Sequence, residues 1–324
     1  PPPPPPPHTH PPHPTTPPPR NSLQRQMCIR DSPYPGTRDK GKESLVKVAA
    51  IQFEPRIGNK DFSVSEGLKM IEKAGKKGAK LMVLPELSNS GYIYNSREEA
   101  FAMSEPVPDG PTTKEWIKKA AKFDAYICAG ITEREGNLLY NSVAVVGPEG
   151  HIGTYRKTHL WNEEKLWFEP GNLGFPVFNL PFGKIGCRIC YDIWFPEVTR
   201  IYVAQGADII CDSTNWVVVD PLQTKEKPTA AYSAQQMSLM NACYSICADR
   251  VGVERECTFI GNSCITDPGG GFVAGPGSPD KPDIVMAEIN VSLARYRHWS
   301  EFNNPLTDRR TDLYDEYLGY YPEI

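Results

Sequence analysis

Several features that would assign the chain to a common class of protein are missing from its 324 residues. No apolar run approaches the roughly 20 residues that a membrane-spanning helix needs. The formal net charge is −4, and no basic stripe marks a nucleic-acid surface. Only one pair among the nine cysteines, Cys187 and Cys190, stands at C-x-x-C spacing, without a second such pair to complete a zinc site. We therefore expect no membrane partner, no nucleic-acid partner and no structural zinc.

The cysteines do not form a disulfide framework either. Their number is odd, their spacing is irregular, and no apolar secretory segment precedes them, so we expect reduced thiols and a cytoplasmic protein. Cys187 and Cys190 stand at C-x-x-C spacing within a predicted strand. Residues an odd number apart on a strand face opposite ways, so we predict that these two thiols share no metal.

Proline is abundant but unevenly placed. Residues 1–35 contain 15 of the 33 prolines and almost no aliphatic side chains, which leaves too little apolar surface to offset the entropy of ordering. We interpret 1–44 as a disordered, non-native leader; the alternative is a ligand for a proline-binding domain. Without the +3 charge of this segment, the rest of the chain carries −7. That charge suits an enzyme for a small uncharged or cationic substrate.

From residue 45 the chain alternates predicted strands and helices. Apolar β-branched runs predict strands, and apolar residues at i, i+4 and i+7 predict helices. The predicted strands are 45–53, 80–84, 125–132, 140–146, 184–190 and 208–212. The predicted helices are 60–77, one that a capping box opens at Thr112, 196–205 and 228–242. The likeness of segments 77–84 and 205–212 indicates an internal duplication, so we predict an α/β fold with two sheets face to face and helices outside.

Charged residues follow two of these strands. Pro85 ends one strand, so Glu86 stands beyond its carboxyl end, where α/β sheets place ligands. Within Tyr155-Arg156-Lys157-Thr158-His159-Leu160, a pocketed Lys157 would provide a fixed positive charge for a developing oxyanion. On a surface, both residues would simply be solvated charges. Spacing alone leaves this choice open.

Cys190 is the candidate nucleophile. A buried strand leads directly into it, and a short bend separates it from a helix that begins near Pro196, which is the geometry of a nucleophile elbow. Free N–H groups at the helix start favour a thiolate and can line an oxyanion hole. Its base is either His159, as a Cys–His pair, or a carboxylate acting with a lysine. Cys128, Cys211, Cys243 and Cys247 lack this context, and we interpret them as core residues.

Taken in order, Leu84-Pro85-Glu86, the segment 155–160 and the segment 190–197 resemble the motifs of the nitrilase superfamily of carbon–nitrogen hydrolases. The resemblance extends from about Val46 to Tyr317 and includes Tyr140-Asn141-Ser142 and the segment 168–172. It implies a four-layer α-β-β-α sandwich. It also implies a Cys-Glu-Lys site that uses neither a metal nor an organic cofactor.

The resemblance also implies a role for each site residue. Cys190 would be the nucleophile, Glu86 the general base, and Lys157 the group that stabilises the tetrahedral intermediate. Family members often have a second glutamate between the lysine and the cysteine, and Glu164 fits that position better than its neighbour Glu163. Four residues are predicted to bind substrate: Glu164, Tyr191, Trp194 and Trp216.

The predicted reaction is hydrolysis of a small neutral carboxamide to an acid and ammonia through a cysteine thioester. Members of the family that act on N-carbamoyl-D-amino acids carry arginines just after the cysteine, whereas this chain has 192–195 without arginine. Nitrilases usually have a Glu-Asn-Tyr type of segment where this chain has 213–216. An N-carbamoyl amine such as N-carbamoylputrescine is the main competing substrate, because those members share Trp-Phe-Pro-Glu and the −7 body would attract a cation. A nitrile is a further alternative.

Two expectations concern the protein beyond its site. A non-enzymatic alternative would keep the fold and use Cys190 as a redox-sensitive binding site, but such a protein has no need for Glu, Lys and Cys together. The predicted hydrolase domain spans 45–302, and the tail 303–324 is rich in apolar residues for a chain end: Leu313, Tyr314, Tyr317, Leu318, Tyr320 and Tyr321. We predict that the tail packs on another subunit of a homodimer or larger homo-oligomer, an assembly that the resemblance also implies.

Overall fold

The computed structural model describes residues 44–314 and 318. The predicted leader, apart from Ser44, and three of the tail's apolar residues, Tyr317, Tyr320 and Tyr321, therefore fall outside the described residues. Ser44 belongs to the folded body, because its N–H donates to Asn290 Oδ1 (3.2 Å) and its hydroxyl donates to the Phe182 carbonyl (3.1 Å). No helix in this described part is both long and apolar enough to cross a membrane.

The first of two six-stranded sheets in residues 44–314 has three parallel strands at its centre, β1, β2 and β3, and antiparallel strands on both sides. Its order is β14 (Asp283–Asn290), β1 (Leu45–Gln52), β2 (Leu81–Val83), β3 (Tyr126–Glu135), β4 (Leu138–Gly147) and β5 (Gly150–Arg156). Gly147 and Gly150 pair at the hairpin between β4 and β5.

The second sheet follows the same scheme, with β7, β8 and β9 parallel and antiparallel strands outside. Its order is β13 (Phe272–Ala274), β12 (Cys264–Thr266), β9 (Tyr244–Ala248), β8 (Ile209–Ser213), β7 (Gly183–Ile189) and β6 (Val177–Leu180). A short ribbon pairs β10 (Val253–Glu254) with β11 (Cys257–Thr258).

The predicted duplication reappears at the entry to β2 and β8. Gly78 and Gly206 both end a helix at positive φ, 86° and 97° respectively, which only glycine adopts without strain. The next residues, Ala79 and Ala207, both donate an N–H back into the preceding helix. The two halves therefore place their central strands by the same local device.

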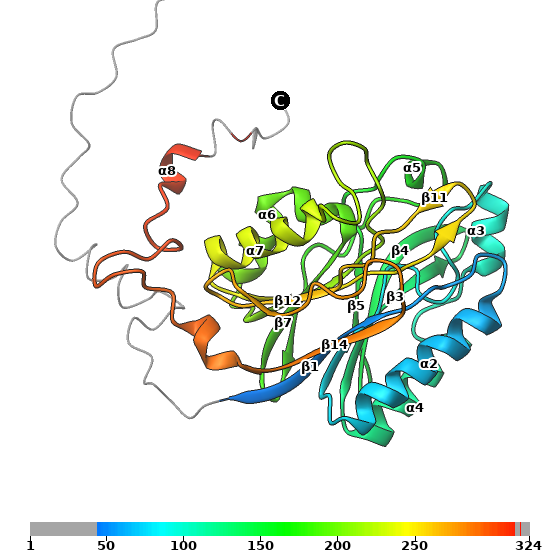
Figure 1. Ribbon diagram of the computed structural model, residues 1–324, viewed down its shortest axis with the longest axis horizontal. Coiled ribbons are helices and arrows are strands. Elements are labelled where there is room, and N and C mark those ends of the chain that lie inside the picture. The colour runs from blue at the N-terminus through cyan, green and yellow to red at the C-terminus, as the bar shows by residue number, and fades with distance from the viewer. Residues whose placement is uncertain (1–43, 315–317, 319–324) are drawn as a thin grey trace, which may run out of the picture. The chain divides into compact units, whose positions relative to one another are not determined.

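Helices cover the outer face of each sheet, so the predicted α-β-β-α layering is confirmed (Figure 1). Helices α2 and α4 pack on the first sheet, and α6 and α7 pack on the second. The helices are α2 (Lys60–Lys76), α3 (Arg97–Met103), α4 (Pro111–Phe123), α5 (Glu164–Trp167), α6 (Pro196–Ala204), α7 (Thr229–Asn241) and α8 (Thr311–Tyr314), with 3₁₀ turns η1 (Cys190–Trp194) and η2 (Val291–Arg295).

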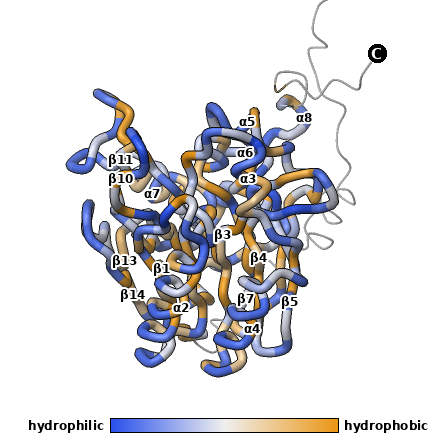
Figure 2. Tube along the Cα trace, turned by 90° about the vertical axis from the view of Figure 1, so that its right-hand side faces the viewer, coloured by the Kyte–Doolittle hydropathy of each residue, from blue (hydrophilic) through white to orange (hydrophobic). Residues whose placement is uncertain are grey.

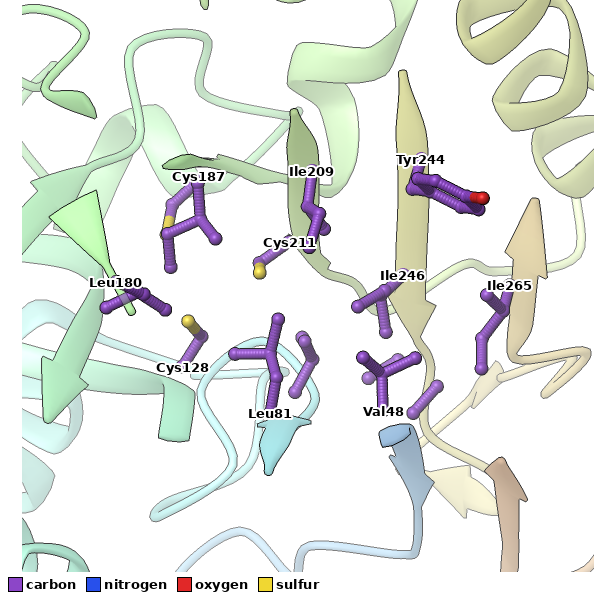
Figure 3. Packing of buried hydrophobic residues seen from close by; sticks show 14 of the residues in the cluster. Val48, Leu81, Cys128, Leu180, Cys187, Ile209, Cys211, Tyr244, Ile246 and Ile265 are labelled. Atoms are coloured by element: carbon purple, nitrogen blue, oxygen red, sulfur yellow. The ribbon is translucent and has the colours of Figure 1, made fainter. Parts of the chain in front are cut away.

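The main core lies between the two sheets. In Figure 3, Leu81 and Val48 of the first sheet face Ile209 and Ile246 of the second. Figure 2 shows the corresponding hydrophobic colour along β3 and β4, whereas hydrophilic colour gathers on turns and outer helices. The central residues of β3 and β4 are buried, which explains the nearly continuous apolar runs in their sequences.

The predicted capping box at Thr112 is wrong. Helix α4 begins at Pro111, with Gly110 as its N-cap, so Thr112 is already inside the first turn. Its N–H and hydroxyl both donate to the carboxylate of Glu105, at 2.9 and 2.7 Å. A tertiary contact from outside the helix therefore replaces the local cap.

Candidate active site

Glu86 lies just beyond β2, in a loop that hydrogen-bonds to residues of the second half of the chain. Its N–H donates to the Thr214 carbonyl (3.4 Å), and its own carbonyl accepts from Asn215 Nδ2 (3.0 Å), so residues that follow β8 hold its backbone. The loop also lies against Gly130 of β3. A Cβ at that glycine would stand 2.3 Å from the Pro85 carbonyl oxygen, so only glycine permits this approach.

The side chains of Glu86, Lys157 and Glu164 form one buried, hydrogen-bonded cluster. Lys157 Nζ donates to Glu86 Oε1 and to Glu164 Oε1, at 2.7 Å each. Asn141 Nδ2 also donates to Glu86 Oε1 (2.7 Å), and the Tyr92 hydroxyl donates to Glu164 Oε1 (2.5 Å). Glu86 Oε2 has no hydrogen-bond partner among the described residues. The cluster thus fixes Lys157 between two carboxylates and leaves one oxygen of Glu86 open.

The backbone of Lys157 is held as firmly as its side chain. Its N–H donates to the Asn141 carbonyl, and its carbonyl accepts from the Gly171 N–H, both at 2.8 Å. A Cβ at Gly171 would stand 2.0 Å from the Arg156 carbonyl oxygen. The segment 168–172, which the resemblance singled out, therefore serves to support the lysine.

Burial and neighbouring charges set the protonation of this cluster. Burial raises the pKa of Glu86 to about 7; the negative charge of Glu164 adds to this rise, and Lys157 opposes it. Burial disfavours the charge of Lys157, but Glu164 and Glu86 outweigh that cost and hold its pKa above the ordinary value. Lys157 is therefore cationic at neutral pH, while Glu86 can exchange a proton there.

Cys190 is the first residue of η1, directly after β7 and before α6. Its φ of 44° lies in the left-handed region, the strained turn expected of a nucleophile elbow. The predicted order of strand, bend and helix is confirmed, with the strand ending at Ile189. Loss of water around the half-buried thiol raises its pKa well above the ordinary value; the charge of Glu86 adds to this, and Lys157 opposes it. The thiol is therefore protonated at neutral pH and needs a base.

Asp192 joins the elbow to the lysine segment, a connection that the sequence reasoning missed. Its buried Oδ2 accepts from the Tyr155 hydroxyl (2.7 Å) and the Ile189 N–H (2.9 Å). Its Oδ1 accepts from the Thr158 hydroxyl (3.1 Å) and from the backbone N–H of His159 (3.1 Å). One carboxylate thereby fixes the Cys190 turn relative to Lys157.

His159, the alternative base, is engaged elsewhere. Its Nδ1 lies 2.8 Å from Asp192 Oδ1, and its ring stacks on Phe195 with centroids 3.6 Å apart. These contacts give the imidazole a structural role beside the elbow. The carboxylate whose charge acts on the Cys190 thiol is Glu86.

The residues predicted to bind substrate divide into two groups. Glu164 is buried against Lys157, whereas its neighbour Glu163 is exposed. Trp216 is buried in an apolar cluster that also contacts Cys190. Tyr191 is partly buried and Trp194 is half exposed, so both stand farther out toward the surface.

Tyr92 is a further site residue that the sequence did not reveal. Glu254 Oε1 accepts the N–H groups of Tyr92 and Ile93, at 2.7 Å each, and Arg250 donates to Glu254 Oε2 (3.0 Å). The tyrosine lies in a loop without a periodic pattern, 72 residues from Glu164. Asn141 donates to Glu86, and the sequence indicated this residue only through the resemblance segment Tyr140-Asn141-Ser142.

Comparisons with known proteins agree with this geometry. Residues 47–298 match the family model described as carbon–nitrogen hydrolase. The chain is 42% identical to a nitrilase of Pyrococcus abyssi (83% of this chain and 99% of the relative) and 31% identical to an N-carbamoylputrescine amidase of Oryza sativa subsp. japonica (85% and 95%). A carbon–nitrogen hydrolase from Helicobacter pylori G27 superimposes with a TM-score of 0.75 at 27% identity (86% and 99%).

The fold and these similarities define the class. The chain belongs to the carbon–nitrogen hydrolase family of the nitrilase superfamily and is a hydrolase of carbon–nitrogen bonds.

Proposed function

We propose that the protein hydrolyses a small neutral carboxamide to the acid and ammonia, with Cys190 as nucleophile, Glu86 as base and Lys157 as oxyanion donor. The observation that carries this proposal is the buried Glu86–Lys157–Glu164 cluster, whose charges act on the Cys190 thiol. With a pKa of about 7, Glu86 is partly ionised at neutral pH and can take the proton of the Cys190 thiol during the attack.

The first half of the reaction forms a thioester. Glu86 Oε2 takes the thiol proton as Cys190 Sγ attacks the amide carbon, and Lys157 holds the negative charge that develops on the carbonyl oxygen. The carbon–nitrogen bond then breaks. Glu86 returns its proton to the nitrogen, so ammonia leaves and the acyl group stays on sulfur.

The second half releases the acid. Glu86 takes a proton from water as the water oxygen attacks the thioester carbon, and Lys157 again holds the oxyanion. The carbon–sulfur bond breaks, and the proton returns to the Cys190 sulfur. Each oxyanion donor of this kind typically contributes roughly 3 kcal/mol.

Two other substrate classes have specific support. The relative with 42% identity is named a nitrilase, which favours a nitrile as the second candidate. The rice relative is named an N-carbamoylputrescine amidase, which favours an N-carbamoyl amine. We place the carboxamide first because 213–216 lacks the Glu-Asn-Tyr type of segment and the scissile group of a carboxamide needs no partner beyond the Cys190, Glu86 and Lys157 side chains.

The test combines one variant with a substrate panel. Ammonia release would be measured from aliphatic and aromatic amides, N-carbamoylputrescine, N-carbamoyl-D-amino acids and nitriles. Cys190→Ala should abolish turnover in a folded protein, whereas Cys257→Ala, at another half-buried thiol of the described chain, should leave it unchanged. A clear lead in kcat/KM for a carbamoyl compound or a nitrile would replace the carboxamide, and an active Cys190→Ala protein would remove the nucleophile.

We also propose a homodimer or larger homo-oligomer in which the tail packs on a partner subunit. Support comes from three large apolar side chains that shortly precede the tail. Tyr296, Trp299 and Phe302 are 71%, 60% and 84% exposed. Light scattering at micromolar concentration should give at least twice the mass of 36.1 kDa. A strict monomer would refute this assembly.

A further inference from the structure

Asn141 belongs to a segment that the sequence singled out, but the proposed reaction gives it no part. It lies on β4 and is almost completely buried. Its Nδ2 donates to Glu86 Oε1 (2.7 Å), and its backbone carbonyl accepts from the Lys157 N–H (2.8 Å). It is thus held against both members of the Glu86–Lys157 pair.

Two acceptors around this hydrogen bond lack partners among the described residues: Asn141 Oδ1 and Glu86 Oε2. The orientation of the amide is fixed, because only the nitrogen of Asn141 can donate to a carboxylate that also accepts from Lys157. Asn141 Oδ1 belongs to the same amide as Nδ2, and Glu86 Oε2 belongs to the same carboxylate as Oε1. Because Nδ2 and Oε1 are 2.7 Å apart, the two unpaired oxygens lie in the same small region. A ligand that donates hydrogen bonds beside the Cys190 elbow would satisfy both acceptors.

We propose that Asn141 Oδ1 accepts a hydrogen of the scissile nitrogen and thereby favours amides over esters. This inference rests on the proposed function, because Glu86 must reach the nitrogen that it protonates. Glu86 Oε2 delivers its proton to the nitrogen lone pair, and Asn141 Oδ1 accepts one of the hydrogens that the nitrogen already carries. An ester oxygen carries no hydrogen and would set a lone pair against Oδ1.

The contrast between an amide and an ester isolates this contact. The substrates are the primary amide of the panel with the highest kcat/KM and the methyl ester of the same acid. Asn141→Ala and the similarly sized Asn141→Leu both lose the support of Glu86, which slows amide and ester together. Loss of the Oδ1 contact slows only the amide. We therefore expect the amide-to-ester ratio of kcat/KM to fall by about tenfold in both variants, the usual worth of one hydrogen bond.

Tyr92→Phe is the matched control. Its hydroxyl donates to Glu164 on the far side of Lys157, so its loss should slow both substrates and leave the ratio unchanged. An unchanged ratio in both Asn141 variants would overturn the selection of amides over esters and leave the proposed amide hydrolysis in place. Failure of the unmutated chain to release ammonia from any amide would overturn the proposed function and this inference with it.

Discussion

Arg156 and Lys157 are consecutive residues at the end of β5, yet each meets a different buried glutamate. Arg156 donates to both oxygens of Glu133, with NH2 to Oε1 at 2.5 Å and Nε to Oε2 at 3.0 Å. The Ser142 hydroxyl also donates to Glu133 Oε2 (2.5 Å). The Arg156–Glu133 pair is therefore saturated.

The Lys157–Glu86 pair involves the residue that follows Arg156 and accepts from Asn141, the residue that precedes Ser142 on β4, but it differs in one respect. Lys157 Nζ and Asn141 Nδ2 both donate to Glu86 Oε1, so Oε2 stays open. A planar guanidinium fork suits a permanent ion pair, whereas a lysine acts as a point charge that can also reach a substrate oxygen. The Arg156–Glu133 pair therefore supports the fold, because both oxygens of its carboxylate are engaged. The Lys157–Glu86 pair keeps one carboxylate oxygen free for the proposed reaction.

The largest expected effect comes from Glu86→Gln, which keeps the shape of the side chain and removes the base. We expect kcat/KM to fall by about 10³-fold, within the usual range for loss of a general base. The melting temperature should change little, because Lys157 keeps its contact with Glu164. Ammonia release and circular dichroism would be measured on the same sample. A folded variant with a tenth of the original activity would show that the base is assigned wrongly.

The same substitution in the saturated pair should have the opposite signature. Glu133→Gln leaves the Arg156 guanidinium buried without its main counter-charge, and breaking a buried pair in this way costs about 3 kcal/mol in the free energy of unfolding. Rates per folded molecule should change much less than in Glu86→Gln. Urea titration and active-site counting separate the two quantities. If Glu133→Gln instead abolished turnover at full stability, the division between the two pairs would not hold.

Much of the fold and the Cys190 elbow could be predicted from local patterns in the sequence, whereas the choice of Glu86 over His159 came only from the family resemblance. Apolar runs marked the central strands, and the elbow was visible in the order of strand, bend and Pro196. The rest depends on contacts between distant loops. Tyr92 reaches Glu164 only because Glu254 holds its loop, and Thr112 lost its predicted capping role to Glu105, which local sequence does not reveal.

A smaller effect is expected at Glu164, whose charge is one cause of the raised pKa of Glu86. Glu164→Gln removes that charge, so the pKa of Glu86 falls and the base stays ionised at lower pH. The acidic limb of the kcat/KM profile should therefore move to lower pH, while the rate at the plateau falls about tenfold through weaker support of Lys157. Glu163→Gln is the matched control. Because Glu163 is exposed, its substitution should leave the acidic limb where it is. An acidic limb that moves to higher pH would contradict this electrostatic account.

The smallest effect is expected at His159, and it sharpens the choice between the two bases. Asparagine in its place can still donate to Asp192, and the backbone N–H of residue 159 also donates to that carboxylate (3.1 Å). The substitution removes the stack on Phe195 and the contact between Nδ1 and the Thr158 hydroxyl (3.1 Å). His159→Asn should therefore lower kcat/KM by about threefold, equivalent to roughly 0.6 kcal/mol. The measurement is a full pH–rate profile beside that of Glu86→Gln. If the two variants were equally inactive, the assignment of Glu86 as the base without help from the imidazole would be wrong.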